Sequence, residues 1–239
     1  MFASCSSTKP FIVDYECNYA TPVVSNGKML VHKGFTVSYL PKYKIPEWVS
    51  YRLIAEEVVL EIPRCDGFYV DPDFTNCAVN EDYTGSGYDR GHFFPAADAW
   101  TPEIMTESFY YTNVAPQKPS FNRGIWASLE EQVREWAVEL DTVYVVTGSY
   151  TSNYSSAKTI GNGIIVPTHF YKVVVVCKHD CKSGIAFLLS NTTYDTEDFW
   201  NYAVTIDELE TITGVNFCEF LPDNIESEIE KTDAEGWLN

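Results

Sequence analysis

The sequence has 239 residues and a mass of 27.1 kDa, which is enough chain for one large domain or two small ones with a buried core. Hydrophobic residues make up 45% and aromatic residues 15% of the chain, so intrinsically disordered and low-complexity classes are excluded. The apolar runs are only a few residues long, as in residues 173–177, which excludes a membrane-spanning segment.

The formal net charge is −18, with 34 acidic against 16 basic residues, which argues against capture of nucleic acid by a broadly basic surface. The acidity is uneven. Residues 191–239 contain 13 acids and one base, Lys231, whereas the rest of the chain carries a net charge of only −6. A site outside this C-terminal part can therefore still be locally positive.

The first 27 residues are rich in Ser, Thr and Pro and weakly periodic, which predicts an N-terminal tail or arm before a single domain at 28–239 with an acidic C-terminal part. Residues 28–40 predict two short strands around a Lys-Gly turn, and residues 48–53 alternate as a strand. Residues 54–62 are compatible with helix or strand. Asp, Asn, Gly and Pro predict a long ordered loop at 64–88.

A helix is predicted at 124–140, because apolar residues recur there at spacings of three and four. Glu130 and Arg134 are four residues apart on a neighbouring stripe of this helix, where they can contact each other. A second helix at 205–213 begins with a Thr-x-x-Glu capping box and ends before Gly214.

Strands are predicted at 142–148, 164–177 and 184–191 from their β-branched and aromatic residues, with a hairpin connection between the last two. The strands come in groups with few βαβ alternations. The fold class is therefore predicted to be α+β, with a central, mainly antiparallel sheet flanked by helices.

Seven cysteines without paired CxxC spacings favour disulfides in an exported protein over a zinc site. Cys177 and Cys181 in CKHDC are compatible with a short disulfide loop or two thiols in a turn. The odd count singles out Cys5, because Phe-Ala-Ser-Cys resembles the end of a bacterial lipoprotein signal. Such a signal implies a lipid anchor at Cys5 and leaves six cysteines for pairing, whereas the bland alternative is an ordinary N-terminal tail.

The segment Tyr88-Asp89-Arg90-Gly91-His92 carries the clearest chemical signal. In an extended chain Arg90 and His92 project on the same face, and Gly91 between them permits a close approach of backbone or ligand. Arg holds phosphate oxygens bidentately, and His can take a proton from water near neutral pH. For the Arg-Gly-His sequence taken alone, the better interpretation would be a surface histidine beside an arginine that is paired with an acid.

The surrounding motifs change that interpretation. EDYTGSGYDRGH, NVAPQ and FNRGIWASLE follow in order along the chain and together resemble the DNA/RNA non-specific endonuclease family. These are the ββα-metal nucleases that include endonuclease G and the secreted Serratia-type nuclease. The resemblance runs from about Lys28 to Pro222 and implies the ββα-metal (His-Me finger) nuclease fold.

Carried over by motif, the resemblance implies that His92 is the general base that activates the attacking water. It implies that Asn122 is the single direct protein ligand of a magnesium ion, with Mn²⁺ or another divalent ion as a substitute. Glu130 matches the helix glutamate that holds water on the metal, and Arg134 matches its partner arginine near the phosphate.

Three further residues match supporting roles. Arg90 corresponds to the arginine that supports phosphate binding, Asn113 to an asparagine that shapes the site, and Arg64, by a looser match, to an arginine on the scissile phosphate. Asp89 is assigned a structural role in the turn. Phe93 departs from the Gln or aliphatic residue usual in the family, which affects packing behind the base.

The resemblance thus implies a magnesium-dependent endonuclease that hydrolyses DNA and RNA to 5′-phosphate products, and it leaves a homodimer open. Two alternatives compete with it. One is a phosphodiesterase for small nucleotides, which fits the weak positive charge, and the other is a catalytically silent nuclease-like binding domain. The presence of both His92 and Asn122 counts against the silent domain.

Overall fold

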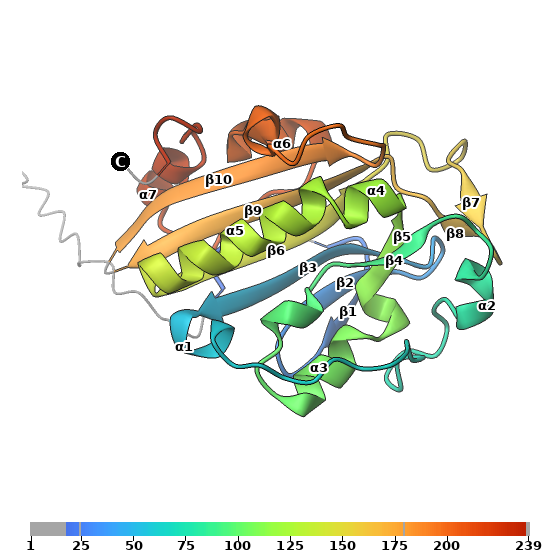
Figure 1. Cartoon of the computed structure of the whole chain (residues 1–239). Helices are drawn as coiled ribbons and strands as arrows, with labels where there is room; N and C mark the ends of the chain where they lie inside the picture. The colour runs from blue at the N-terminus through green and yellow to red at the C-terminus, as the bar shows by residue number, and fades with distance from the viewer. Residues whose placement is uncertain (1–17, 24, 179, 238–239) are drawn as a thin grey trace, which may run out of the picture.

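A computed structural model describes residues 18–23, 25–178 and 180–237. Its centre is a seven-stranded sheet in the order β1-β2-β3-β6-β9-β10-β11, and every neighbouring pair is antiparallel (Figure 1). The strands are β1 Lys28–Val31, β2 Thr36–Leu40, β3 Ile45–Ile54, β6 Thr142–Tyr150, β9 His169–Lys178, β10 Asp180–Ser190 and β11 Ala203–Val204. The predicted α+β class with a mainly antiparallel sheet is confirmed.

Helices cover both faces of this sheet, because its long strands bury side chains on both sides. Val145 and Val174 lie in a core that also contains Leu129 and Val133 of the long helix α5 (Ile125–Leu140). The alternate positions of the same strands form a second core under α6 (Ile206–Thr213) and α7 (Asp223–Ile229). Figure 1 shows α5 crossing one face, with α6 and α7 beside β10.

The remaining elements are short. They are the helices α1 Ala55–Val58, α2 Asn80–Tyr83, α3 Pro102–Ser108 and α4 Pro119–Asn122; the 3₁₀ helices Ala96–Asp98, Tyr111–Asn113 and Trp200–Tyr202; and the strands β4 Asp89–His92, β5 Val114–Gln117, β7 Thr159–Ile160 and β8 Ile164–Ile165. The segment at 54–62 is therefore the end of β3 followed by a helical turn. The strand predicted at 164–177 is divided into β8 and β9.

The helix predicted from Gly124 begins at Ile125, and Asn122 lies in the separate helix α4. The interruption is at Gly124, where a Cβ atom would lie 2.7 Å from the backbone oxygen of Ser120. The capping box of the second predicted helix is confirmed: Thr205 Oγ1 accepts from the Glu208 N–H, and the helix closes at Gly214 in the left-handed region.

The expectation of six paired cysteines is wrong, because Cys65, Cys77 and Cys218 carry free thiols. Cys77 and Cys218 are buried in the two different cores, so the sheet separates them. The backbones of Cys177 and Cys181 face each other across the β9–β10 hairpin. Cys5 lies outside the described residues.

Part of the predicted N-terminal arm is packed on the domain. Tyr19 and Ala20 are buried in the core beneath α6, and Asn18 Nδ2 donates to the carbonyl of Tyr51 at 2.8 Å. In the described part of the chain, no helix is both long and apolar enough to cross a membrane.

Candidate active site

The site is built on a small two-stranded sheet that joins two of the sequence motifs. Strand β4 consists of the DRGH tetrapeptide and pairs antiparallel with β5, which consists of VAPQ. Gly91 has no room for a side chain, since a Cβ atom there would lie 2.1 Å from the side chain of Gln117. The close approach predicted at Gly91 is thus made by Gln117, and it locks the two motifs in register.

One cavity of about 450 Å³ collects residues from β4, α4, α5 and the loop after α1. Six of the seven predicted site residues line it, namely Arg64, Arg90, His92, Asn122, Glu130 and Arg134. Asn113 does not. Residues 70 positions apart in sequence therefore meet in one cleft, on the face of the sheet covered by α5.

His92 sits half-buried at the end of β4 between two aromatic rings, those of Phe68 and Phe109, with ring centroids 5.2 and 5.0 Å away. Loss of hydration lowers the pKa of His92 to about 3, and the positive charge of Arg64 adds to the effect. The ring is therefore neutral at physiological pH. Its Nε2 atom is shielded from solvent and has no hydrogen-bond partner among the described residues, and the residue lines the cleft.

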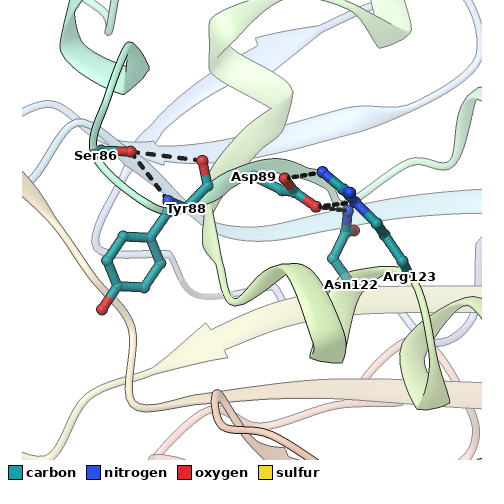
Figure 2. A network of polar contacts seen from close by, with 5 residues as sticks. All are labelled: Ser86, Tyr88, Asp89, Asn122 and Arg123. Atoms are coloured by element: carbon teal, nitrogen blue, oxygen red, sulfur yellow. Dashed lines mark hydrogen bonds and ion pairs between the residues drawn. The ribbon is translucent and has the colours of Figure 1, made fainter.

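The orientation of Asn122 is set by Asp89 and follows from the chemistry of the pair (Figure 2). Asn122 Nδ2 donates to Asp89 Oδ2 at 3.1 Å, and an ionised carboxylate can only accept. The amide oxygen of Asn122 is consequently the free end of the group. Asp89 is held in turn by two 2.7 Å contacts from the guanidinium of Arg123.

Glu130 lines the cleft one helical turn beyond the start of α5, above a buried lysine. Burial raises the pKa of Glu130, and the nearby positive charge of Lys172 opposes that rise. Lys172 is fully buried, donates from Nζ to Thr147 Oγ1 at 2.6 Å and lies 4.9 Å from the ring centre of Trp126. Burial lowers the pKa of Lys172, and the negative charge of Glu130 opposes that fall. Each charge therefore stabilises the ionised form of the other group.

Arg134 makes its ion pair with Asp98, with Nη1 and Oδ1 3.1 Å apart, and forms none with Glu130 among the described residues. The contact expected between Glu130 and Arg134 is therefore wrong. Asp98 is almost fully buried in the 3₁₀ helix after β4, so this pair ties α5 to the chain behind His92. Arg90 is held by Asn80, whose Oδ1 accepts from Nη2 at 2.7 Å.

The cleft is locally positive in an acidic protein. Four arginines line it, Arg64, Arg90, Arg123 and Arg134, against the carboxylates of Asp89 and Glu130. A hollow with convergent guanidinium groups attracts a polyanion through its local field even when the net charge opposes binding. The geometry thus combines an anion-binding surface with a neutral imidazole and a free amide oxygen.

Asn113 acts behind the cleft. Its Nδ2 donates to the carbonyls of Phe94 and Ser108, and its Oδ1 accepts from the Phe94 N–H at 2.9 Å. These bonds fix the chain directly after His92. Phe93 is fully buried, with its ring centroid 5.8 Å from that of Phe170, which agrees with a packing role.

The sequence pattern of the DNA/RNA non-specific endonuclease family matches residues 15–224. The chain belongs to this family. It is 33% identical over 216 residues to Nuclease C1 of Cunninghamella echinulata var. echinulata, an alignment that covers 80% of this chain and 83% of that protein. A nuclease of Nostoc sp. is 32% identical over 224 residues, covering 88% and 80%.

The fold agrees with this assignment. A chain in the crystal structure of the EndoG/EndoGI complex superposes with a TM-score of 0.77 and 28% identity, covering 90% of this chain and 94% of that one. The nuclease therefore has the ββα-metal fold, and it is an enzyme that acts on nucleic acids, a non-specific DNA/RNA endonuclease.

Sequence reasoning missed three residues of the nuclease's site, namely Arg123, Asp98 and Lys172. Arg123 follows Asn122 directly but lies in the break between α4 and α5. Hydrophobic periodicity does not predict there which way a side chain points. Asp98 gives no signal in the sequence. Lys172 did leave a signal, because it lies inside strand β9 between the apolar residues Tyr171 and Val173, and a fully buried lysine requires a partner.

Proposed function

We propose that the nuclease hydrolyses phosphodiester bonds of DNA and RNA to 5′-phosphate products with a divalent cation, Mg²⁺ or a substitute such as Mn²⁺. The single observation that carries the proposal is the meeting of His92 Nε2, which has no partner among the described residues, and the oriented amide of Asn122 in one arginine-lined cavity. A catalytically silent binding domain would require neither the unpartnered His92 nitrogen nor the oriented Asn122 amide.

The donors in the cleft suit a hard cation. Asn122 offers an amide oxygen, and Glu130 offers a carboxylate whose pKa burial raises, so a nearby positive charge would stabilise its ionised form. Mg²⁺ prefers oxygen ligands and keeps several waters, which agrees with a site of so few protein groups. When bound, the ion would supply positive charge at the phosphate and make bound water more acidic.

In this mechanism the neutral His92 removes a proton from the attacking water at Nε2. The new bond to phosphorus forms as the bond to the 3′ oxygen breaks, and the departing 3′ oxygen takes a proton from a water molecule, which leaves a 3′ hydroxyl and a 5′ phosphate. Arg90 and Arg64 contact the phosphate oxygens, whose charge grows in the transition state. Arg134 lines the same cleft and is held there by Asp98. None of these groups contacts a sugar hydroxyl in the proposal, so DNA and RNA are equally acceptable.

The test is digestion of supercoiled plasmid and of a long RNA by the purified full chain, with Mg²⁺ and with EDTA. The His92→Ala variant is expected to lose cleavage of both polymers, whereas His169→Ala, a half-buried histidine outside the cleft, is the matched control. The ends of the products are identified by labelling them with a polynucleotide kinase. Products that accept the label only after phosphatase treatment carry 5′ phosphates. Cleavage that survives in His92→Ala, or in EDTA, contradicts the proposal.

Two rival functions give different results in the same assay. A phosphodiesterase for small nucleotides would act on a dinucleotide at least as fast as on long duplex, and a silent binding domain would cleave nothing with any divalent ion. The four arginines spread along the cleft support a long polyanion as substrate.

Export with a lipid anchor at Cys5 is a separate proposal. It is supported by the Phe-Ala-Ser-Cys sequence, which resembles the end of a bacterial lipoprotein signal. The full chain expressed in a bacterium is expected to incorporate labelled palmitate, and Cys5→Ser to abolish it. A wild-type chain that takes up no label contradicts the anchor.

A further inference from the structure

Three carboxylates meet on the side of the sheet opposite the active site. Asp207 and Glu210 lie on α6, and Glu230 caps the C-terminal end of α7. One oxygen from each lies within 4.8 Å of the others. The two helices lie beside β10 in Figure 1, and the backbone N–H of Asp207 donates to the carbonyl of Glu230 at 3.1 Å. Residues far apart in sequence are thus brought together by backbone contact.

Glu230 distinguishes this group from a solvated acidic face. Its side chain is only 7% exposed, and its Oε1 has no hydrogen-bond partner among the described residues. A buried carboxyl oxygen without a hydrogen-bond partner is unfavourable, because burial removes the water that would otherwise solvate it. A carboxylate oxygen of Glu230 lies within 4.8 Å of oxygens of Asp207 and Glu210, so a cation held among the three side chains would be a partner for Glu230.

The protein itself supplies little positive charge there. Burial raises the pKa of Glu230 to about 8, and the charges of Glu210 and Glu226 add to the rise. Lys231 acts in the opposite direction, but its Nζ donates to Ser227 Oγ at 2.8 Å. Glu210 already accepts the Phe217 N–H at 2.7 Å with Oε1, which orients its carboxylate and leaves the second oxygen.

We propose that Asp207, Glu210 and Glu230 form a second cation site, distinct from the active site, that binds Ca²⁺ and joins α6 to the end of α7. The donors are all carboxylate oxygens, which hard cations prefer. Ca²⁺ bonds oxygen at about 2.3–2.6 Å in irregular geometry, so oxygens up to about 5 Å apart can share it, whereas Mg²⁺ demands a tighter octahedron.

The site is independent of catalysis. It lies over the core that contains Ile206, Leu209 and Ile229, while the catalytic cleft lies on the α5 face. A bound ion would therefore stabilise the acidic C-terminal part against the sheet without contacting the substrate. It gives three of the 13 acids at 191–239 a structural role.

The test is calcium binding to the full chain by calorimetry, in the Asn122→Ala background so that the active site contributes no ion. We expect one Ca²⁺ per chain and a rise in Tm on adding CaCl₂. Glu230→Gln in the same background is expected to weaken binding about tenfold or more, because affinity depends on ligand charge. Glu228→Gln, an exposed acid on the same helix, is the matched control and should bind as before.

In EDTA at neutral pH, Glu230→Gln should melt at about the same temperature as its parent, because the raised pKa already keeps Glu230 mostly uncharged and an amide of similar size replaces it. If this variant does not fold, Asp207→Asn, which is half-buried at the start of α6, replaces it. The proposal is overturned if no Ca²⁺ binds, if Glu230→Gln and Glu228→Gln bind equally, or if Mg²⁺ binds as tightly as Ca²⁺.

Discussion

Asn122 Nδ2 donates to Asp89 Oδ2 at 3.1 Å, and this contact decides which end of the Asn122 amide is free to bind a cation. The same carboxylate accepts two hydrogen bonds from Arg123, so Asp89 holds both the Asn122 amide and the Arg123 guanidinium in place (Figure 2). The aspartate of the DRGH motif thereby orients the candidate metal ligand, beyond its expected role in the turn.

Asp89→Asn is expected to lower the apparent affinity for the divalent ion about 10- to 100-fold, because an amide at position 89 no longer forces the Asn122 nitrogen toward it. The measurement is cleavage rate against metal concentration. Asp66→Asn, in the loop before the site, serves as a control of equal chemistry. An unchanged metal dependence in a folded Asp89→Asn protein would show that the contact has no orienting role.

His92 should make stability depend on pH. Its pKa is about 3 in the folded protein and near 6.5 in an unfolded chain, so the unfolded state binds the extra proton between these values. Stability is therefore lost as pH falls through this window, by up to about 1.4 kcal/mol per pH unit. Urea unfolding of His92→Gln between pH 6.5 and 4 is expected to show a shallower slope by that amount, and identical slopes would refute the assignment.

Lys172→Met is expected to shift the acidic limb of the pH–rate profile to higher pH. Lys172 opposes the rise in the pKa of Glu130, so its removal keeps Glu130 protonated over a wider range. Activity lost at neutral pH should thus return partly under alkaline conditions. Lys158→Met, an exposed lysine, is the matched control. A uniform loss of rate with no shift would assign Lys172 a packing role only.

Gly91→Ala is expected to destabilise the protein by about 1–3 kcal/mol, because the added methyl group overlaps the side chain of Gln117. Shortening the neighbour in Gly91→Ala/Gln117→Ala should recover part of that loss. Denaturant unfolding measures both variants. Gly67→Ala, where a Cβ atom would meet nothing within 4 Å, should leave stability nearly unchanged.

Local patterns in the sequence determined much of this protein. The strand alternation, the apolar stripe of α5 and the capping box of α6 depend on neighbours within a few residues, and the structure confirms them. The DRGH, NVAPQ and FNRGIWASLE segments also determined the family, because their residue types and order are legible without coordinates.

Only the tertiary structure decided which charges meet. Arg134 reaches Asp98 across 36 positions, and Lys172 of the sheet acts on the pKa of Glu130. Asn122 stands in the separate helix α4, which ends before Gly124. The Glu230 carboxylate meets Asp207 in the same manner. Hydrophobic periodicity reports which face of an element is buried, but it carries no information about the partner element, so long-range polar contacts are decided by packing alone.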